Sequence, residues 1–100
     1  MTRQKQYLFR PLAEQDMEGI FDYTLQEFGE AQADSYIRAL FETFQALADT
    51  PGMARKRDEV RSGLRSYPVN AHVVFFRESE TGIVIARVLH QSMDCQSKSY

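Results

Sequence analysis

The most constraining feature of the chain is a β-hairpin pattern near its C-terminal end. Two β-compatible runs, Ala71 to Glu78 and Ile83 to His90, flank a turn-forming segment from Ser79 to Gly82. Branched and aromatic residues on both sides of a short, glycine-containing loop are typical of two antiparallel strands. A further short strand is expected just before them, from Leu64 to Tyr67, and Pro68 is expected to end it. The second half of the chain therefore predicts three antiparallel strands in series.

Two amphipathic helices are expected before these strands. The first follows Pro11, which is favourable in a first helical turn, and runs from Leu12 to Phe28, where Gly29 stops it. Its apolar stripe recurs every three or four positions and consists of Ala13, Met17, Ile20, Phe21, Thr24 and Phe28. Its acidic residues are expected to point outward, and they are Glu14, Asp16, Glu18 and Asp22. The second helix extends from about Glu30 to Asp49, with one broad apolar face formed by Ala33, Tyr36, Ile37, Leu40, Phe41, Phe44, Leu47 and Ala48.

The order of these elements predicts the fold class. A short β-compatible run, Gln6 to Arg10, precedes the helices, whose connection is so short that they must fold back as an αα-hairpin. We expect an α+β fold of order β-α-α-β-β-β, with an N-terminal strand, the helical hairpin, and a three-stranded antiparallel meander covered by the helices on one face. One hundred residues suffice for one modest core, so residues 1–100 should form a single domain, with a core at about 5–94 and a flexible tail at 95–100.

Charge is divided unevenly along the chain. The first fifty residues carry four basic and nine acidic side chains, whereas the last fifty carry eight basic and five acidic ones. The most basic stretch, Met53 to Gly63, has no convincing period and is predicted to be a loop. A protein that bound nucleic acid mainly through phosphates would carry a larger basic excess, so direct nucleic-acid binding is not expected.

Signals for export or membrane insertion are not evident in the sequence. The apolar run Tyr7 to Phe9 is too short for the core of a signal peptide, and no stretch approaches the length of a membrane span. The single cysteine, Cys95, cannot form a disulfide within the chain, which fits a reducing compartment. We therefore expect a soluble, cytoplasmic protein.

The hairpin pattern also predicts which strand residues share a face. If the loop holds two or four residues, odd positions of the first strand lie beside even positions of the second. One face then carries Val73, Phe75, Arg77, Val84, Ala86, Val88 and His90, and the other carries His72, Val74, Phe76, Ile83, Ile85, Arg87 and Leu89. Both faces are largely apolar, but the helices can cover only one of them. The other face is therefore expected to need a partner.

The same assignment argues against a metal site. His72 and His90 fall on opposite predicted faces, and Cys95 lies beyond the hairpin. Metal ligands must converge, and no other spacing of His, Cys and carboxylates indicates that they do. The sequence also lacks a GxSxG elbow, a glycine-rich phosphate loop and an HExxH pair. No catalytic residue, metal or cofactor is therefore assigned.

Several segments, taken in order, resemble the ParE branch of the RelE/ParE toxin superfamily. The resemblance covers roughly residues 5–94, and the segments are specific to this branch when all of them occur in this order. The segments are FRPLAEQDMEGIFDYTLQEFGEAQADSYI (Phe9–Ile37), LADTPGM (Leu47–Met53), RKRDEVRSGLR (Arg55–Arg65), PVNAHVVFFR (Pro68–Arg77) and RVLHQSMD (Arg87–Asp94).

This resemblance implies the toxin component of a type II toxin–antitoxin module. Such a toxin inhibits DNA gyrase in the cytoplasm by protein contact, without chemistry of its own, and arrests growth. A ParD-like antitoxin neutralises it by laying a segment that is otherwise disordered over the toxin's helices and sheet. That partner would also cover the apolar sheet face left open by the hairpin pattern.

One alternative is a RelE-like, ribosome-dependent mRNA endoribonuclease. That reaction needs side chains that activate the ribose 2′-hydroxyl and stabilise the transferring phosphoryl group. The arginines and His90 could supply charge and a proton donor, but no tyrosine directly follows His90, and Tyr100 lies far along the tail. The nuclease set is therefore incomplete. A further alternative is an interaction module that binds an antitoxin without arresting growth.

Two groups of candidate binding residues follow from the resemblance and the patterns. Those assigned to the target are Arg55, Arg57, Arg61, Arg65, Arg77, Arg87 and His90, and those assigned to the antitoxin are Tyr36, Leu40, Phe44, Phe75 and Val88. Arg77 and Arg87 are the most informative, because a guanidinium within an apolar strand is costly unless it pairs with a carboxylate or reaches a surface rim.

Overall fold

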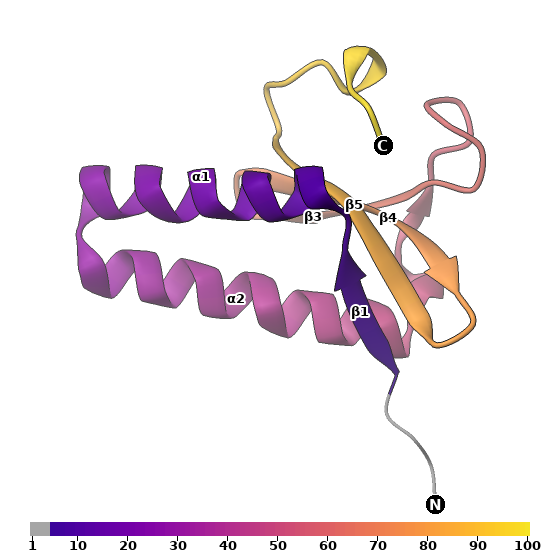
Figure 1. The fold of residues 1–100 in the computed structure, drawn as a ribbon, viewed down its shortest axis with the longest axis horizontal. Helices are drawn as coiled ribbons and strands as arrows, with labels where there is room; N and C mark the ends of the chain where they lie inside the picture. The colour runs from indigo at the N-terminus through magenta and orange to yellow at the C-terminus, as the bar shows by residue number, and fades with distance from the viewer. Residues whose placement is uncertain (1–4) are drawn as a thin grey trace, which may run out of the picture.

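The structure is a computed structural model, and it describes residues 5–100 of the chain. Its strands and long helices are β1 (Gln6–Phe9), α1 (Pro11–Phe28), α2 (Glu30–Asp49), β2 (Arg55–Lys56), β3 (Arg65–Val69), β4 (His72–Ser79) and β5 (Gly82–His90). Short 3-10 turns follow α2, at Pro51–Met53, and β5, at Cys95–Ser97. Figure 1 shows α1 and α2 antiparallel, with one end of the pair at the sheet and the other extending well beyond it.

All of these strands belong to one mixed sheet of order β1-β5-β4-β3-β2. β1 runs parallel to β5, and every other neighbouring pair is antiparallel. Two parallel neighbours need a long crossover connection, and part of the chain between β1 and β5 is the helical hairpin, which packs on the sheet. The predicted α+β class is confirmed, including the N-terminal strand, the helical hairpin and the antiparallel meander.

The segment before the meander differs from the prediction in two places. Arg55–Lys56, within the predicted loop, pairs with β3 as the short strand β2, and β3 continues through Pro68 to Val69. β2 lies opposite only Arg65 and Ser66, so Pro68 lies where β3 has no strand on its outer side. A strand tolerates proline at such an edge. A two-residue strand, for its part, is too short to show a period.

Gly29 alone separates the two helices. Its φ of 87° lies in the left-handed region, which glycine adopts without steric cost. Its N–H donates to the Leu25 carbonyl at 3.0 Å, and its own carbonyl accepts from the Ala33 N–H at 3.0 Å. The same residue therefore ends α1 and begins α2, which confirms the predicted stop.

The main hydrophobic core lies between the helices and one face of the sheet. Phe44 of α2 is completely buried at its centre, and its ring centroid lies 5.6 Å from that of Tyr7 and 5.4 Å from that of Phe9. These contacts hold β1 against α2. The other buried members include Ala13, Ile20, Leu40, Leu47, Ala48, Val74, Phe76, Ile83, Ile85 and Val88.

Gly82 allows β1 to approach the start of β5. Its φ is +152°, and a Cβ atom at this position would collide with the backbone carbonyl of Gln6. Gln6 is the register partner of Gly82 in the parallel pair. The turn glycine of the hairpin is therefore also required by the strand that joins from the N-terminus.

A β-bulge in the hairpin changes which residues share a face. Near the turn the predicted pairing holds, since Arg77 lies opposite Val84 and Phe76 opposite Ile85. The next pair is Phe75 with Arg87, so Ala86 is an extra residue in β5. From Arg87 to the end of β5, each side chain therefore lies on the sheet face opposite to the one predicted. The prediction is therefore wrong for Arg87, Val88, Leu89 and His90, and His72 lies directly opposite His90.

The second sheet face is covered by the chain itself. Val60 and Leu64, from the segment between β2 and β3, form a buried cluster there with Phe75, Ala86 and Leu89. Cys95 and Tyr100 of the tail pack against this second-face cluster. The expectation that this face is open is therefore wrong, because the basic segment and the tail already cover it. The tail, expected to be flexible, lies against the sheet in this structure.

Candidate partner-binding surfaces

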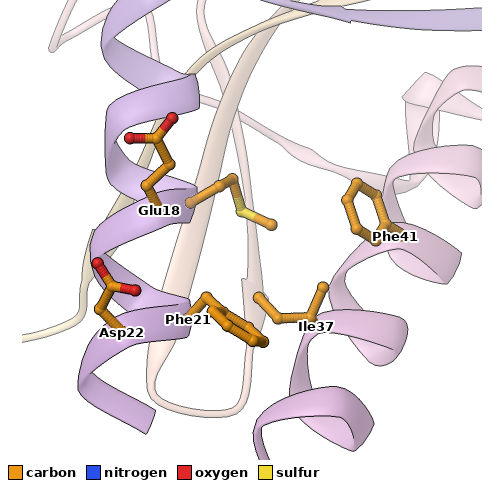
Figure 2. Close-up of a pocket in the computed structure, with 6 residues that line it drawn as sticks. Glu18, Phe21, Asp22, Ile37 and Phe41 are labelled. Atoms are coloured by element: carbon orange, nitrogen blue, oxygen red, sulfur yellow. The ribbon is translucent and has the colours of Figure 1, made fainter. Parts of the chain in front are cut away.

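An apolar groove between the two helices is open to a partner. Met17 and Phe21 of α1 and Ile37 and Phe41 of α2 line a cavity of about 440 Å³. In Figure 2, Phe21, Ile37 and Phe41 point into the space between the helices, and Glu18 and Asp22 lie on its α1 side. We call this surface the helix groove.

The helix groove combines an apolar floor with an acidic rim. Phe41 remains 40% exposed although it belongs to the apolar face of α2. The sequence pattern placed Met17, Phe21, Ile37 and Phe41 among the core residues and did not separate them from the buried positions. The available signal was the breadth of the apolar face of α2, since a helix that contacts one sheet buries only part of so broad a face.

Most residues assigned to the antitoxin lie inside the protein. Leu40 and Phe44 are completely buried in the main core, and Val88 and Phe75 are almost completely buried in the two clusters. These four side chains therefore do not contribute to an open surface. Tyr36 is half-buried, and its hydroxyl bonds within the protein. The apolar pattern predicted correctly that these residues are buried. It did not predict which apolar residues of the helices remain exposed to solvent.

The residues assigned to the target do not form one surface. Arg57 and Arg61 lie on the second face near Tyr100, Arg65 pairs with Glu78 at 3.2 Å, and Arg77 donates to the Ser62 carbonyl. Arg55 is exposed on the edge strand β2. Arg57 forms an ion pair with Glu59 at 2.7 Å, and the hydrogen bond from this pair raises the pKa of Arg57 and lowers the pKa of Glu59.

Arg87 pairs with a carboxylate of α1, as its place in an apolar strand required. Its Nε and Nη2 donate to the two oxygens of Asp16 at 2.7 and 2.9 Å, and these bonds raise the pKa of Arg87. Asp16 also accepts from the Val88 backbone N–H at 3.0 Å. Asp16 is therefore not the outward, solvated residue that the helical pattern predicted.

His72 and His90 meet at one end of the sheet. Their ring centroids are 5.4 Å apart, so the argument that they lie on opposite faces is wrong. His72 Nδ1 lies 2.6 Å from the Tyr36 hydroxyl, and His90 Nδ1 lies 2.7 Å from the Ser92 hydroxyl. Both rings line a cavity of about 410 Å³ beside α1. In residues 5–100, no group of three or more His, Cys, Asp or Glu side chains could hold a metal ion.

We expect the stability of the protein to fall as the pH drops below about 6.5, the usual pKa of histidine. Burial, and then the nearby charge of His90, lower the pKa of His72, whereas Asp16 acts weakly in the opposite direction. The unfolded chain therefore binds a proton at a pH at which folded His72 does not, and unfolding becomes more favourable in acid. Urea unfolding of the parent protein and the His72→Gln variant between about pH 7.5 and 5.5 measures this effect. If the free energy of unfolding changed with pH by the same amount in both proteins, His72 would not be the cause of the loss of stability.

In the part of the chain that the structure describes, neither helix is long and apolar enough to cross a membrane.

Comparison with known proteins identifies the family. Residues 7–95 match the family described as ParE toxin of type II toxin-antitoxin system, parDE. Toxin ParE1 of Mycobacterium tuberculosis is 37% identical over 89 residues, which cover 88% of this chain and 91% of the relative. Toxin ParE1 of Caulobacter vibrioides is 37% identical over 93 residues, which cover 93% of this chain and 96% of the relative.

One solved structure has the same fold as this chain. The chromosomal ParDE system from P. aeruginosa contains a chain that superposes with a TM-score of 0.74 at 18% identity, covering 89% of this chain and 98% of that one. These findings confirm the resemblance noted in the sequence. The chain belongs to the ParE toxin family of type II toxin–antitoxin systems.

Proposed function

We propose that this protein is a cytoplasmic toxin that inhibits DNA gyrase by protein–protein contact and is neutralised by a ParD-like antitoxin. Membership of the ParE family, over residues 7–95, is the observation that carries the proposal. The surfaces support it because the apolar helix groove offers a partner a place to dock without any catalytic group.

Supercoiling of relaxed plasmid by purified DNA gyrase tests this proposal. The protein should inhibit supercoiling, and the cognate antitoxin should relieve the inhibition. Supercoiling that continues unchanged at a large excess of the protein would contradict gyrase as the target. The assay uses the full chain, so the contributions of the tail and the edge strand are retained.

We assign the antitoxin to the helix groove. Four apolar side chains form its floor, and Glu18 and Asp22 give its rim a negative charge. An amphipathic segment with apolar anchors and flanking basic residues complements this surface, because its apolar side fills the floor while its cations face the two carboxylates. The occupied groove would bury the Phe41 ring, which is partly exposed in the free chain.

The variant Phe41→Ala should weaken antitoxin binding by roughly thirtyfold, because truncating a central apolar anchor commonly costs about 2 kcal/mol of binding free energy. Titration calorimetry with purified antitoxin measures the change. Tyr23→Ala is the matched control, since Tyr23 is an exposed aromatic residue of α1 that does not line this groove. Equal affinities of Phe41→Ala and the parent protein would exclude the groove.

We assign the gyrase contact to the open sheet edge at β2. Arg55 and Lys56 are both exposed there, at the end of the strand order. The variant Arg55→Glu should therefore weaken gyrase inhibition while antitoxin affinity stays as in the parent protein. If this variant inhibited gyrase as strongly as the parent protein, the gyrase contact would lie elsewhere on the chain.

A ribonuclease is the second candidate, and one observation favours it. Tyr100 lies far along the tail in sequence, but the tail folds back and brings it near Arg57, Arg61 and Arg87. Burial nevertheless raises the pKa of Tyr100, against the opposing effect of these guanidinium groups, and its hydroxyl donates to the Cys95 carbonyl at 2.8 Å. A protonated, engaged phenol is a poor base for the ribose hydroxyl. If the protein cleaved ribosome-bound mRNA and the Tyr100→Phe variant did not, ribonuclease activity would replace gyrase inhibition as the first candidate.

A further inference from the structure

The C-terminal tail lies across the second sheet face and ends in an aromatic anchor. The Tyr100 ring centroid lies 5.2 Å from that of Phe75, and the Arg61 guanidinium carbon lies 5.6 Å from the centre of the Tyr100 ring. In Figure 1 this tail, in yellow, runs back toward the sheet after leaving β5. The second-face cluster thus has an apolar floor that already holds a tyrosine side chain.

Arginine side chains hold the backbone of the tail. Arg61 Nη2 donates to the carbonyls of Gln96 and Lys98 at 3.2 and 2.9 Å, and Arg87 Nη1 donates to the Ser99 carbonyl at 3.3 Å. The strand pairs of the sheet in residues 5–100 do not include the tail. Its attachment therefore depends on a few side-chain contacts and not on a backbone ladder.

Arg61 differs from its neighbours in the acceptors that it uses. In residues 5–100 the ion pairs join Arg57 to Glu59, Arg65 to Glu78 and Arg87 to Asp16. Arg61 instead donates to neutral main-chain carbonyls, including that of Val60 at 2.6 Å. A carboxylate accepts a stronger hydrogen bond from a guanidinium than a neutral carbonyl does. An acidic segment could therefore replace the tail at Arg61.

We propose that the second face is a docking site for an extended, acidic segment of a partner protein that carries an aromatic side chain, and that the tail occupies this site in the free chain as a displaceable strap. The tail shows the geometry of the occupant, with its ring on Phe75 and its backbone along Arg61. The partner's carboxylates take the place of the tail carbonyls. This site lies apart from the helix groove and does not depend on what the groove binds.

A peptide suits this face better than a nucleic acid. Val73, Phe75 and Leu89 give it an apolar floor, which favours a hydrophobic anchor over a phosphodiester backbone. Arg57 and Arg87 are already paired with carboxylates, so of these three arginines only Arg61 brings a charge without an ion-pair partner. Binding to a polyanion commonly uses several such charges.

Fluorescence anisotropy with a labelled synthetic peptide, a run of glutamates followed by one tyrosine, tests the proposal on the full chain. The variant Arg61→Gln should bind this peptide at least about tenfold more weakly, because hydrogen bonds to a charged group are lost. The variant Tyr100→Gly should bind it more tightly than the parent protein, because the competing strap has lost its anchor. Arg38→Gln, an exposed arginine of α2, is the matched control and should bind as the parent does.

Two further measurements keep the result independent of folding defects in the variants. In the parent protein, saturation with the peptide should speed alkylation of Cys95, which is half-buried at the start of the strap, where it packs against the second-face cluster, and is the only cysteine of the chain. A peptide with lysines in place of the glutamates should neither bind nor change that rate. Equal peptide affinity in Arg61→Gln, or slower alkylation of Cys95 in the bound parent, would overturn the proposal. Tighter binding of a single-stranded oligonucleotide with the same dependence on Arg61 would also overturn it.

Discussion

Replacing Asp16 by alanine should lower the free energy of unfolding by about 3–5 kcal/mol, the usual cost of leaving one partner of a buried ion pair without the other. The Asp16 and Arg87 side chains are each only 14% exposed, so water cannot replace the lost carboxylate fully. The substitution removes the acceptor of two guanidinium hydrogen bonds and of the Val88 backbone N–H. Urea unfolding followed by circular dichroism measures the change.

The location of Asp16 explains why its loss should be so costly. β1 pairs with β5 only as far as Ile85, so beyond that residue β5 has no strand neighbour on its outer side. α1 passes this open edge and supplies Asp16, which satisfies the Val88 N–H in place of a missing strand. The ion pair is therefore also a bond between α1 and the sheet.

Two comparisons separate the ion pair from a general effect of mutating α1. Glu27→Ala removes an exposed acid of the same helix and should change stability by less than about 0.5 kcal/mol. The double variant Asp16→Ala/Arg87→Met should be more stable than Asp16→Ala alone, because no uncompensated charge stays buried. A cost below about 1 kcal/mol for Asp16→Ala would show that the pair is weak in solution.

The sequence predicted what regular periodicity can show, and the errors arise where a single residue interrupts it. Both helices, Gly29 between them and the strand order of the meander follow from spacing. The extra residue Ala86 is a local irregularity with no signature in an apolar run, and it exchanged the faces of His90 and its neighbours. Likewise, Asp16 has the same spacing as solvated acids, but it pairs with Arg87 and with the Val88 N–H at the edge of β5 that β1 does not reach.

The candidate site was less predictable than the fold, because binding surfaces depend on what remains uncovered. An apolar pattern does not distinguish Phe44, which is completely buried, from Phe41, which is 40% exposed one turn away. The basic segment and the tail looked irregular in sequence, yet their side chains fill the second face through contacts distant along the chain, such as Arg61 with Lys98. Such contacts leave no periodic trace.

The variant Phe44→Ala should lower the free energy of unfolding by about 3–5 kcal/mol, because deleting a buried aromatic side chain removes its contacts and leaves a cavity. The Phe44 ring packs against Tyr7 and Phe9 of β1 and lies 5.9 Å from the Phe41 ring, so the cavity would form where the N-terminal strand meets α2. Phe41→Ala is the matched control and should cost under about 1 kcal/mol, since its ring is partly in water already. If the groove assignment holds, the two variants should show opposite profiles: Phe44→Ala loses stability, whereas Phe41→Ala loses antitoxin affinity. Equal stability losses in urea unfolding would mean that Phe41 belongs to the core and that the helix groove is closed in solution.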